Sequence, residues 1–211
     1  MNLLITGAWR CTQEQLDFIR NLGHGVCFLP NERDPLPVSP DWVEGVICNG
    51  LFLHHPIEAF VNLRYIQLTS AGFDRVPMEY IQSYGIEIHN ARGVYSIPMA
   101  EFALAGVLQL YKQARFFAEN QNRCRWEKHR ELLELYGKRV CIVGCGSVGT
   151  ECAKRFSAFG CEVTGIDLYP REDGAYIGMR PLTELDRELA RTDILVLTLP
   201  LTEDTKHLIN A

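Results

Sequence analysis

Short apolar runs alternate with amphipathic stretches from the start of the chain to about residue 90. The apolar runs predict strands over residues 3–6, 26–29, 45–48, 65–69 and 86–89. The amphipathic stretches predict helices over residues 13–21, 56–61 and 77–83, the first with Thr12 as its N-cap and Gly23 as its stop. Alternating strands and helices indicate a parallel sheet with helices on both faces.

A second series of strands and helices follows a long apolar helix, which is predicted to run from Pro98 to Phe117. Because apolar positions cover much of its circumference, this helix should be buried between layers or against another subunit. A polar segment with Trp126 comes next, and then predicted strands over 139–143, 162–167, near Met179 and over 193–199, with helices over 148–159, 182–190 and 204–209. We therefore expect two domains, residues 1–97 and 98–211.

The strongest motif is Gly144-Cys145-Gly146-Ser147-Val148-Gly149, which directly follows one predicted strand and opens a helix. In this context it predicts a dinucleotide-binding turn. Gly144 permits the tight turn, Gly146 lets the backbone approach a pyrophosphate, and Gly149 lets helix and strand pack closely. The pyrophosphate would lie on the free N–H groups at the helix N-terminus. The alternative is an ordinary strand-to-helix turn.

Asp167 ends the next predicted strand, 18 residues after Gly149. Its carboxylate would accept hydrogen bonds from the adenosine ribose and would repel a 2′-phosphate, which favours NAD over NADP. Arg171 is the residue that could weaken this preference. The alternative is a surface aspartate without a role in binding.

Two further turns follow predicted strands. Leu199-Pro200-Leu201-Thr202-Glu203-Asp204-Thr205 ends a strand that should lie beside the strand of the glycine motif in the order 3-2-1-4, so its tip should touch the cofactor. Thr202 would also serve as an ordinary helix cap there. Ser70-Ala71-Gly72-Phe73-Asp74 would present backbone N–H groups that suit a carboxylate, although taken alone a simple tight turn is the more ordinary interpretation.

Composition narrows the possible functions. The chain is 47% hydrophobic and 22% charged, as in ordinary globular proteins, and its net charge of −5 gives no electrostatic reason to expect nucleic acid or an anionic membrane as partner. The longest apolar stretch, residues 102–111, is about half of what a membrane span needs, and the N-terminus lacks the features of a signal peptide. The eight cysteines form no CxxC pair and no zinc-ligand pattern with histidine, which predicts reduced thiols in a cytoplasmic protein without a metal.

Taken together, these motifs resemble the D-isomer-specific 2-hydroxyacid dehydrogenases, the family of phosphoglycerate dehydrogenase, glyoxylate/hydroxypyruvate reductase and D-lactate dehydrogenase. The matching segments occur in the family's order: residues 70–74, 99–101, Trp126, 136–140, 144–149 and 199–205. Ser147-Val148 departs from the Arg-Ile that is more common in the family. This departure changes little, because backbone amides bind the phosphates there.

The resemblance implies a flavodoxin-like substrate domain followed by a Rossmann domain, and hydride transfer between a nicotinamide and a small 2-keto or 2-hydroxy acid. It implies that the amides of Ala71 and Gly72 hold the substrate carboxylate and that Asn49-Gly50 forms the neighbouring wall of the pocket. It also implies a homodimer through the helix at 98–117. The cofactor-binding residues that it implies are Gly144, Gly146, Ser147, Val148, Gly149, Asp167, Leu199 and Pro200.

In the resembling family, the catalytic Arg, Glu and His lie in the last third, which this sequence does not reach. None of the six histidines is placed to replace them, and Glu101 is better explained by a favourable interaction with a helix N-terminus. We therefore expect a fragment of an NAD-dependent 2-hydroxyacid dehydrogenase that is inactive alone. The alternatives are a catalytically inactive NAD-binding or interaction protein and, less favoured, another Rossmann oxidoreductase such as an alanine dehydrogenase-like enzyme.

Overall fold

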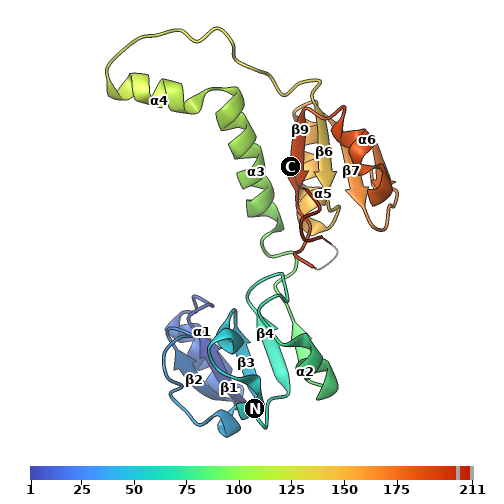
Figure 1. The fold of residues 1–211 in the computed structure, drawn as a ribbon. Helices are drawn as coiled ribbons and strands as arrows, with labels where there is room; N and C mark the ends of the chain where they lie inside the picture. The colour runs from blue at the N-terminus through green and yellow to red at the C-terminus, as the bar shows by residue number, and fades with distance from the viewer. Residues whose placement is uncertain (203–204, 210–211) are drawn as a thin grey trace. The chain divides into compact units, whose positions relative to one another are not determined.

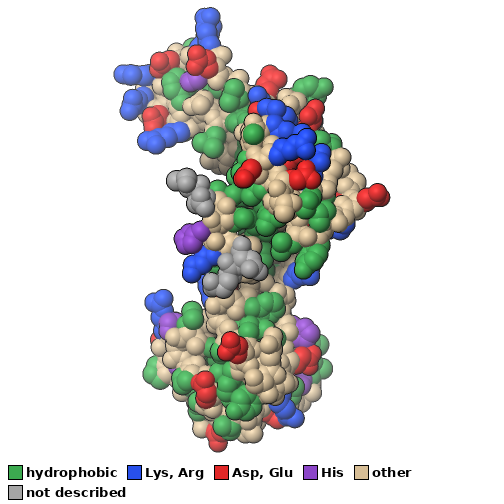
Figure 2. Space-filling view, turned by 45° about the vertical axis from the view of Figure 1, so that its right-hand side comes forward, with side chains coloured by type: hydrophobic (Ala, Val, Ile, Leu, Met, Phe, Trp, Pro, Cys, Tyr) green, Lys and Arg blue, Asp and Glu red, His purple; other side chains and the backbone are tan. Residues whose placement is uncertain are grey.

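The computed structural model describes residues 1–202 and 205–209. The chain forms two compact units, Met1–Arg92 and Gly93–Ala211 (Figure 1). Each unit contains one parallel sheet. On the face drawn in Figure 2, acidic and basic side chains are interspersed, and hydrophobic side chains are exposed between them. Among the described residues, no helix is both long enough and apolar enough to cross a membrane.

The first unit confirms the predicted flavodoxin-like sheet. Its five strands are parallel, in the order β2-β1-β3-β4-β5. They are β1 (Asn2–Thr6), β2 (Gly25–Leu29), β3 (Gly45–Cys48), β4 (Tyr65–Leu68) and β5 (Glu87–His89). Leu4, Val46 and Ile66 lie on adjacent central strands and are completely buried, so the core of the unit lies against the middle of the sheet.

The helices of the first unit are α1 (Gln13–Asn21), α2 (Met78–Ser83) and the short 3₁₀ helices η1 (Pro40–Trp42), η2 (Leu51–Leu53) and η3 (Ile57–Ala59). Thr12 caps α1 through a reciprocal pair of hydrogen bonds with Gln15, as its sequence position predicted. The short helix predicted over 56–61 forms only as the 3₁₀ helix η3, which is shorter than predicted. Ile57 and Phe60, three residues apart, are both buried, and that spacing suits a 3₁₀ turn.

The second unit confirms the strand order 3-2-1-4. Its parallel strands lie in the order β8-β7-β6-β9 and are β6 (Arg139–Val143), β7 (Glu162–Asp167), β8 (Gly178–Pro181) and β9 (Ile194–Leu197). One face of β6, through Val140 and Ile142, packs on α5 (Ser147–Ala158). The opposite face packs toward η4 (Leu182–Glu184) and α6 (Leu185–Leu189).

The long helix predicted over 98–117 is in fact two helices, α3 (Ser96–Tyr111) and α4 (Ala114–Asn122). The break is at Gln113, whose φ of 51° is left-handed. Tertiary contacts hold this end of α3: the Leu133 amide donates to the Tyr111 carbonyl (3.1 Å), and Lys112 Nζ donates to the Leu133 carbonyl (2.7 Å). No glycine or proline marks the break in the sequence. α3 runs beside α5 (Figure 1).

The helix predicted over 204–209 is not seen in the described part of that segment. Residues 205–209 form turns and bends, and Asp204 lies outside the described residues.

Candidate cofactor and substrate sites

The glycine-rich turn between β6 and α5 requires glycine at two positions for steric reasons. Gly144 has a φ of 97°, and a Cβ there would lie 2.9 Å from the Leu199 amide nitrogen. A Cβ on Gly149 would lie 2.1 Å from the carbonyl oxygen of Gly144. The first glycine therefore permits the turn beside β9, and the last lets α5 pack onto the turn.

Gly146 differs from both because its surroundings are open. No described atom beyond its chain neighbours lies within 4 Å of the position that a Cβ would take. Gly146 is the N-cap of α5 and has no side chain to cap the helix. Within the described chain, the amides of Ser147, Val148 and Gly149 find no hydrogen-bond acceptor. An open backbone surface at an uncapped helix N-terminus fits the pyrophosphate of a dinucleotide.

Asp167 lies beside this turn at the end of β7 and is partly buried. Its Oδ2 accepts a hydrogen bond from the Cys145 amide at 2.7 Å, and its Oδ1 accepts one from the Tyr169 amide at 3.0 Å. The two bonds orient the carboxylate and leave each oxygen with a lone pair. The carboxylate is thus able to accept hydrogen bonds from a ribose diol.

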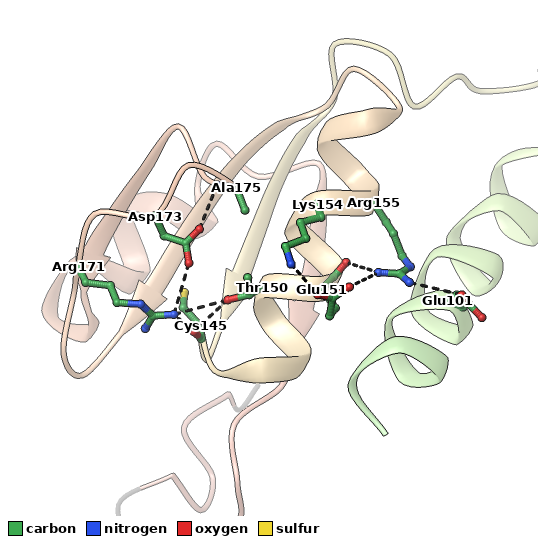
Figure 3. Close-up of polar contacts among 9 residues, drawn as sticks. All are labelled: Glu101, Cys145, Thr150, Glu151, Lys154, Arg155, Arg171, Asp173 and Ala175. Carbon is green, nitrogen blue, oxygen red and sulfur yellow. Dashed lines mark hydrogen bonds and ion pairs between the residues drawn. The ribbon is translucent and has the colours of Figure 1, made fainter. Parts of the chain in front are cut away.

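Arg171 lies against the same turn (Figure 3). Its Nη2 donates to the Cys145 carbonyl at 2.7 Å and lies 3.5 Å from a carboxylate oxygen of Asp173. A cation and the Asp167 carboxylate therefore flank one residue of the glycine-rich turn. Arg171 was named from the sequence as the residue that could weaken the preference for NAD, but its hydrogen bond to Cys145 is visible only in the structure.

The end of β9 holds the turn from the other side. The Thr198 hydroxyl donates to the Gly144 carbonyl at 2.5 Å. Thr198 was not identified from the sequence. The feature that could have identified it is its position as the single polar residue in an apolar run. The predicted contact residues Leu199 and Pro200 follow directly and line an apolar cavity of about 250 Å³ together with Thr205. Beyond them, Thr202 and Thr205 exchange amide-to-hydroxyl hydrogen bonds of 2.8 and 3.2 Å, while Glu203 and Asp204 lie outside the described residues.

The Cys145 thiol, within the glycine motif, is completely buried. Burial raises the pKa of this thiol to about 11, so it is protonated at neutral pH. The protonated thiol lies within hydrogen-bond distance of the Ile142 and Ile166 carbonyls, at 3.7 and 3.6 Å, and its burial and protonation argue against a role as a nucleophile.

In the first unit, the turn at Ala71-Gly72 follows β4. Its carbonyls are held: Asn90 Nδ2 donates to the Ala71 carbonyl at 2.6 Å, and the Ser70 hydroxyl donates to the Gly72 carbonyl at 3.2 Å. The amides of Ala71 and Gly72 have no acceptor in the part of the chain that the structure describes. The turn therefore offers two N–H donors for an anion.

The turn at Asn49-Gly50, after β3, is different. The amides of Asn49 and Gly50 donate to the two carboxylate oxygens of Glu32, each at 2.7 Å. Nothing in the sequence pattern singled out Glu32, which lies 17 residues before Asn49. The Asn49 side-chain oxygen is buried and has no hydrogen-bond partner within residues 1–202 and 205–209.

Glu101 forms an ion pair with Arg155 of α5 at 3.4 Å (Figure 3). Arg155 also pairs with Glu151, which in turn pairs with Lys154. These contacts connect α3 to α5 and account for Glu101 without a catalytic role. The predicted interaction with a helix N-terminus is wrong, because α3 begins at Ser96 and its first turn holds no acidic residue. No cluster of three or more metal-ligating side chains occurs among the described residues.

A parallel sheet of order 3-2-1-4, with an open glycine turn between its first strand and helix, defines a Rossmann-type dinucleotide-binding protein. The family model for the D-isomer specific 2-hydroxyacid dehydrogenase, NAD binding domain, matches residues 104–211. The chain therefore belongs to the D-isomer-specific 2-hydroxyacid dehydrogenase family and carries its NAD-binding domain.

Two curated relatives agree with this assignment, and a solved structure agrees with the fold. A D-lactate dehydrogenase of Treponema pallidum is 33% identical over 156 residues, which is 71% of this chain and 45% of the relative. A D-3-phosphoglycerate dehydrogenase of Methanocaldococcus jannaschii is 30% identical over 72% of this chain and 30% of its own length. The structure of a glyoxylate reductase from Paecilomyes thermophila is similar with a TM-score of 0.82 at 20% identity. The match covers 99% of this chain and 68% of the glyoxylate reductase. The chain thus spans half or less of the length of these two curated relatives.

Proposed function

We propose that this chain supplies the NAD site and part of the substrate site of an NAD-dependent dehydrogenase acting on a small 2-hydroxy acid, with the reverse reduction of a 2-keto acid. The open backbone at Gly146, at the uncapped N-terminus of α5, supports this proposal most directly. The preceding residue, Cys145, donates an amide hydrogen bond to Asp167, so the ribose-binding carboxylate lies beside the same turn. In this proposal residues 98–211 bind the cofactor and residues 1–97 bind the substrate.

The residues divide the binding work. The amides of Ser147, Val148 and Gly149 face the pyrophosphate, and Asp167 accepts hydrogen bonds from the ribose hydroxyls, which favours NAD over NADP. Leu199 and Pro200 contact the cofactor from the end of β9. Bound NAD supplies the hydride chemistry.

The substrate carboxylate binds at the turn after β4. The amides of Ala71 and Gly72 donate to it, and the open donors of that turn support this role. Asn49 and Gly50 form the neighbouring wall of the pocket. The substrate class rests on the family, since relatives in it include a D-lactate dehydrogenase and a glyoxylate reductase.

We further propose that these 211 residues bind NADH but do not catalyse its oxidation by a 2-keto acid. The sequence holds no counterpart of the family's Arg, Glu and His, which act as a unit, so no partial rate is expected. Titration of the chain with NADH, followed by cofactor fluorescence, should show saturable binding. Incubation with NADH and glyoxylate, hydroxypyruvate or pyruvate should leave the absorbance of NADH unchanged. Absence of NADH binding would refute the cofactor site, and turnover at ordinary enzyme rates would refute the inactivity.

We propose a homodimer through the 98–117 segment, in which α3 provides most of the contact. Phe102 is 81% exposed and Leu110 is 73% exposed on this helix, and large apolar side chains at such exposure indicate a missing partner. Phe102→Asp should shift the mass measured by light scattering from dimer to monomer. Phe18→Asp, at an exposed phenylalanine on α1, is the matched control and should leave the dimer intact. A wild-type monomer at high concentration would contradict the proposal.

A cytoplasmic location is proposed from the cysteines. All eight are unpaired, and five of them are buried. Thiols that remain reduced are typical of a reducing compartment.

A further inference from the structure

We propose that Glu32 is an internal carboxylate ligand, which fills an anion-binding nest at Asn49-Gly50 and so keeps that nest closed to a dissolved carboxylate. The nest is defined as the amides of Asn49 and Gly50 together with the hydroxyl of Thr6.

The contacts of Glu32 join the carboxyl ends of three strands. Thr6 is the last residue of β1, Glu32 follows β2, and Asn49-Gly50 follows β3. Oε1 accepts from the Thr6 hydroxyl at 2.8 Å and from the Asn49 amide at 2.7 Å, while Oε2 accepts from the Gly50 amide at 2.7 Å. His55 Nε2 lies 3.0 Å from the carbonyl oxygen of Glu32 and holds the backbone of the same residue.

These donors are what a free carboxylate would need from the protein. Two consecutive backbone amides and a hydroxyl, converging on two oxygens at short distances, form a charge-assisted anion site. Because Glu32 is tethered to that site by the chain, it competes with any dissolved carboxylate at a high effective concentration. The nest is therefore satisfied before a substrate arrives.

The neighbouring charges do not reverse this conclusion. The side chain of Arg75 approaches Gly50, since its Cδ lies 3.9 Å from the position of a Cβ on that glycine. Its Nε lies 3.8 Å from a carboxylate oxygen of Asp74. The Asp74 carboxylate therefore compensates the charge of Arg75, so that Arg75 adds little attraction for a second anion at the nest. Among the described residues, the Ala71 and Gly72 amides donate to no acceptor. The Asp74 carboxylate lies beside them, since its Oδ1 is 2.6 Å from the position of a Cβ on Gly72.

The first test follows backbone amide resonances of the full chain during titration with sodium formate, with sodium chloride as the ionic-strength control. The amides of Ala71 and Gly72 should shift saturably, and those of Asn49 and Gly50 should not. Formate-dependent shifts of Asn49 and Gly50 comparable to those of Ala71 and Gly72 would overturn the proposal for Glu32. If the Ala71 and Gly72 amides fail to respond, the substrate assignment fails, and the variants below still decide the role of Glu32.

The second test removes the internal ligand. Glu32→Ala should lower the Tm by roughly 10 °C, because three hydrogen bonds to a charged group are lost. Formate should recover several degrees of that loss, and chloride at equal ionic strength should not. Glu58→Ala, which removes an exposed carboxylate of the same unit, should change neither the Tm nor the response to formate. A Glu32→Ala chain that is as stable as the wild type, or that gains no more from formate than from chloride, would overturn the proposal.

Glu32→Gln keeps the side-chain volume and decides the case if the alanine variant does not fold. The amide group fills the nest but replaces one acceptor by a donor, so formate should give no recovery. Hydrogen exchange should become at least about tenfold faster than in the wild type at whichever of the Asn49 and Gly50 amides faces the new NH2 group, since one charge-assisted bond is worth that much. Exchange at the wild-type rate at both amides would overturn the proposal.

Discussion

Replacing Gly146 by alanine separates cofactor binding from folding. The φ of Gly146 is −73°, which alanine adopts without strain, and the site of the new methyl group is open. The folded chain should therefore accept the methyl group. A pyrophosphate bound to the amides of Ser147 and Val148 would meet it directly.

The size of the effect follows from the hydrogen bonds at risk. A phosphate oxygen bound to a backbone amide lies about 2.8 Å from the nitrogen, and glycine is what allows the backbone to come so close. Displacing the pyrophosphate should cost one or two charge-assisted bonds, about 2–4 kcal/mol in total. The Kd for NADH should rise roughly 30- to 1000-fold. The free energy of unfolding should stay the same or rise by about 0.5–1 kcal/mol, because alanine restricts the unfolded chain.

Fluorescence titration with NADH measures the first quantity, and urea unfolding without cofactor measures the second. Gly178→Ala, in β8, is the matched control, because its added methyl group also enters open space. The control should bind NADH as the wild type does. Wild-type affinity in Gly146→Ala would refute the assignment of the pyrophosphate to this turn. A loss of more than about 2 kcal/mol of stability would refute the steric argument, since typical overpacking costs of that size need a close contact.

Three further predictions test other contacts. Gly149→Ala should destabilise the fold by at least about 2 kcal/mol in urea unfolding, because its Cβ would lie 2.1 Å from the Gly144 carbonyl oxygen; wild-type stability would contradict this. The wild type should bind NADH more tightly than NADPH, and Asp167→Ala should narrow the difference; equal affinities in the wild type would contradict the role of Asp167. Hydrogen bonds from the Arg139 side chain and amide lower the pKa of Asp193 from 3.8 to about 2, so this stabilisation is complete above about pH 4 and is lost as the pH falls toward 2. Asp193→Asn should make the free energy of unfolding less dependent on pH between about pH 4 and pH 2. An unchanged pH dependence would exclude the Asp193–Arg139 contact as its cause.

Much of this protein is determined by local sequence. Thr12 caps α1 because its hydroxyl reaches an amide three residues away, and β7 begins and ends at the residues that its apolar pattern predicts. The glycine motif predicts its own turn, since the steric demands at Gly144 and Gly149 are visible in residue type and spacing. Such features depend on backbone geometry within a few residues, which one stretch of sequence contains.

Only the tertiary structure decided the contacts between distant segments. The Thr198 hydroxyl reaches the Gly144 carbonyl 54 residues away, and no local pattern predicts that pair. α3 ends where Leu133 binds the Tyr111 carbonyl, although the apolar pattern continues. Glu32 looks like a loop residue in the sequence, yet it occupies the nest at Asn49-Gly50 because parallel strands bring the ends of β1, β2 and β3 to one edge of the sheet. Strand order and register place these groups together, and packing over the whole unit determines both.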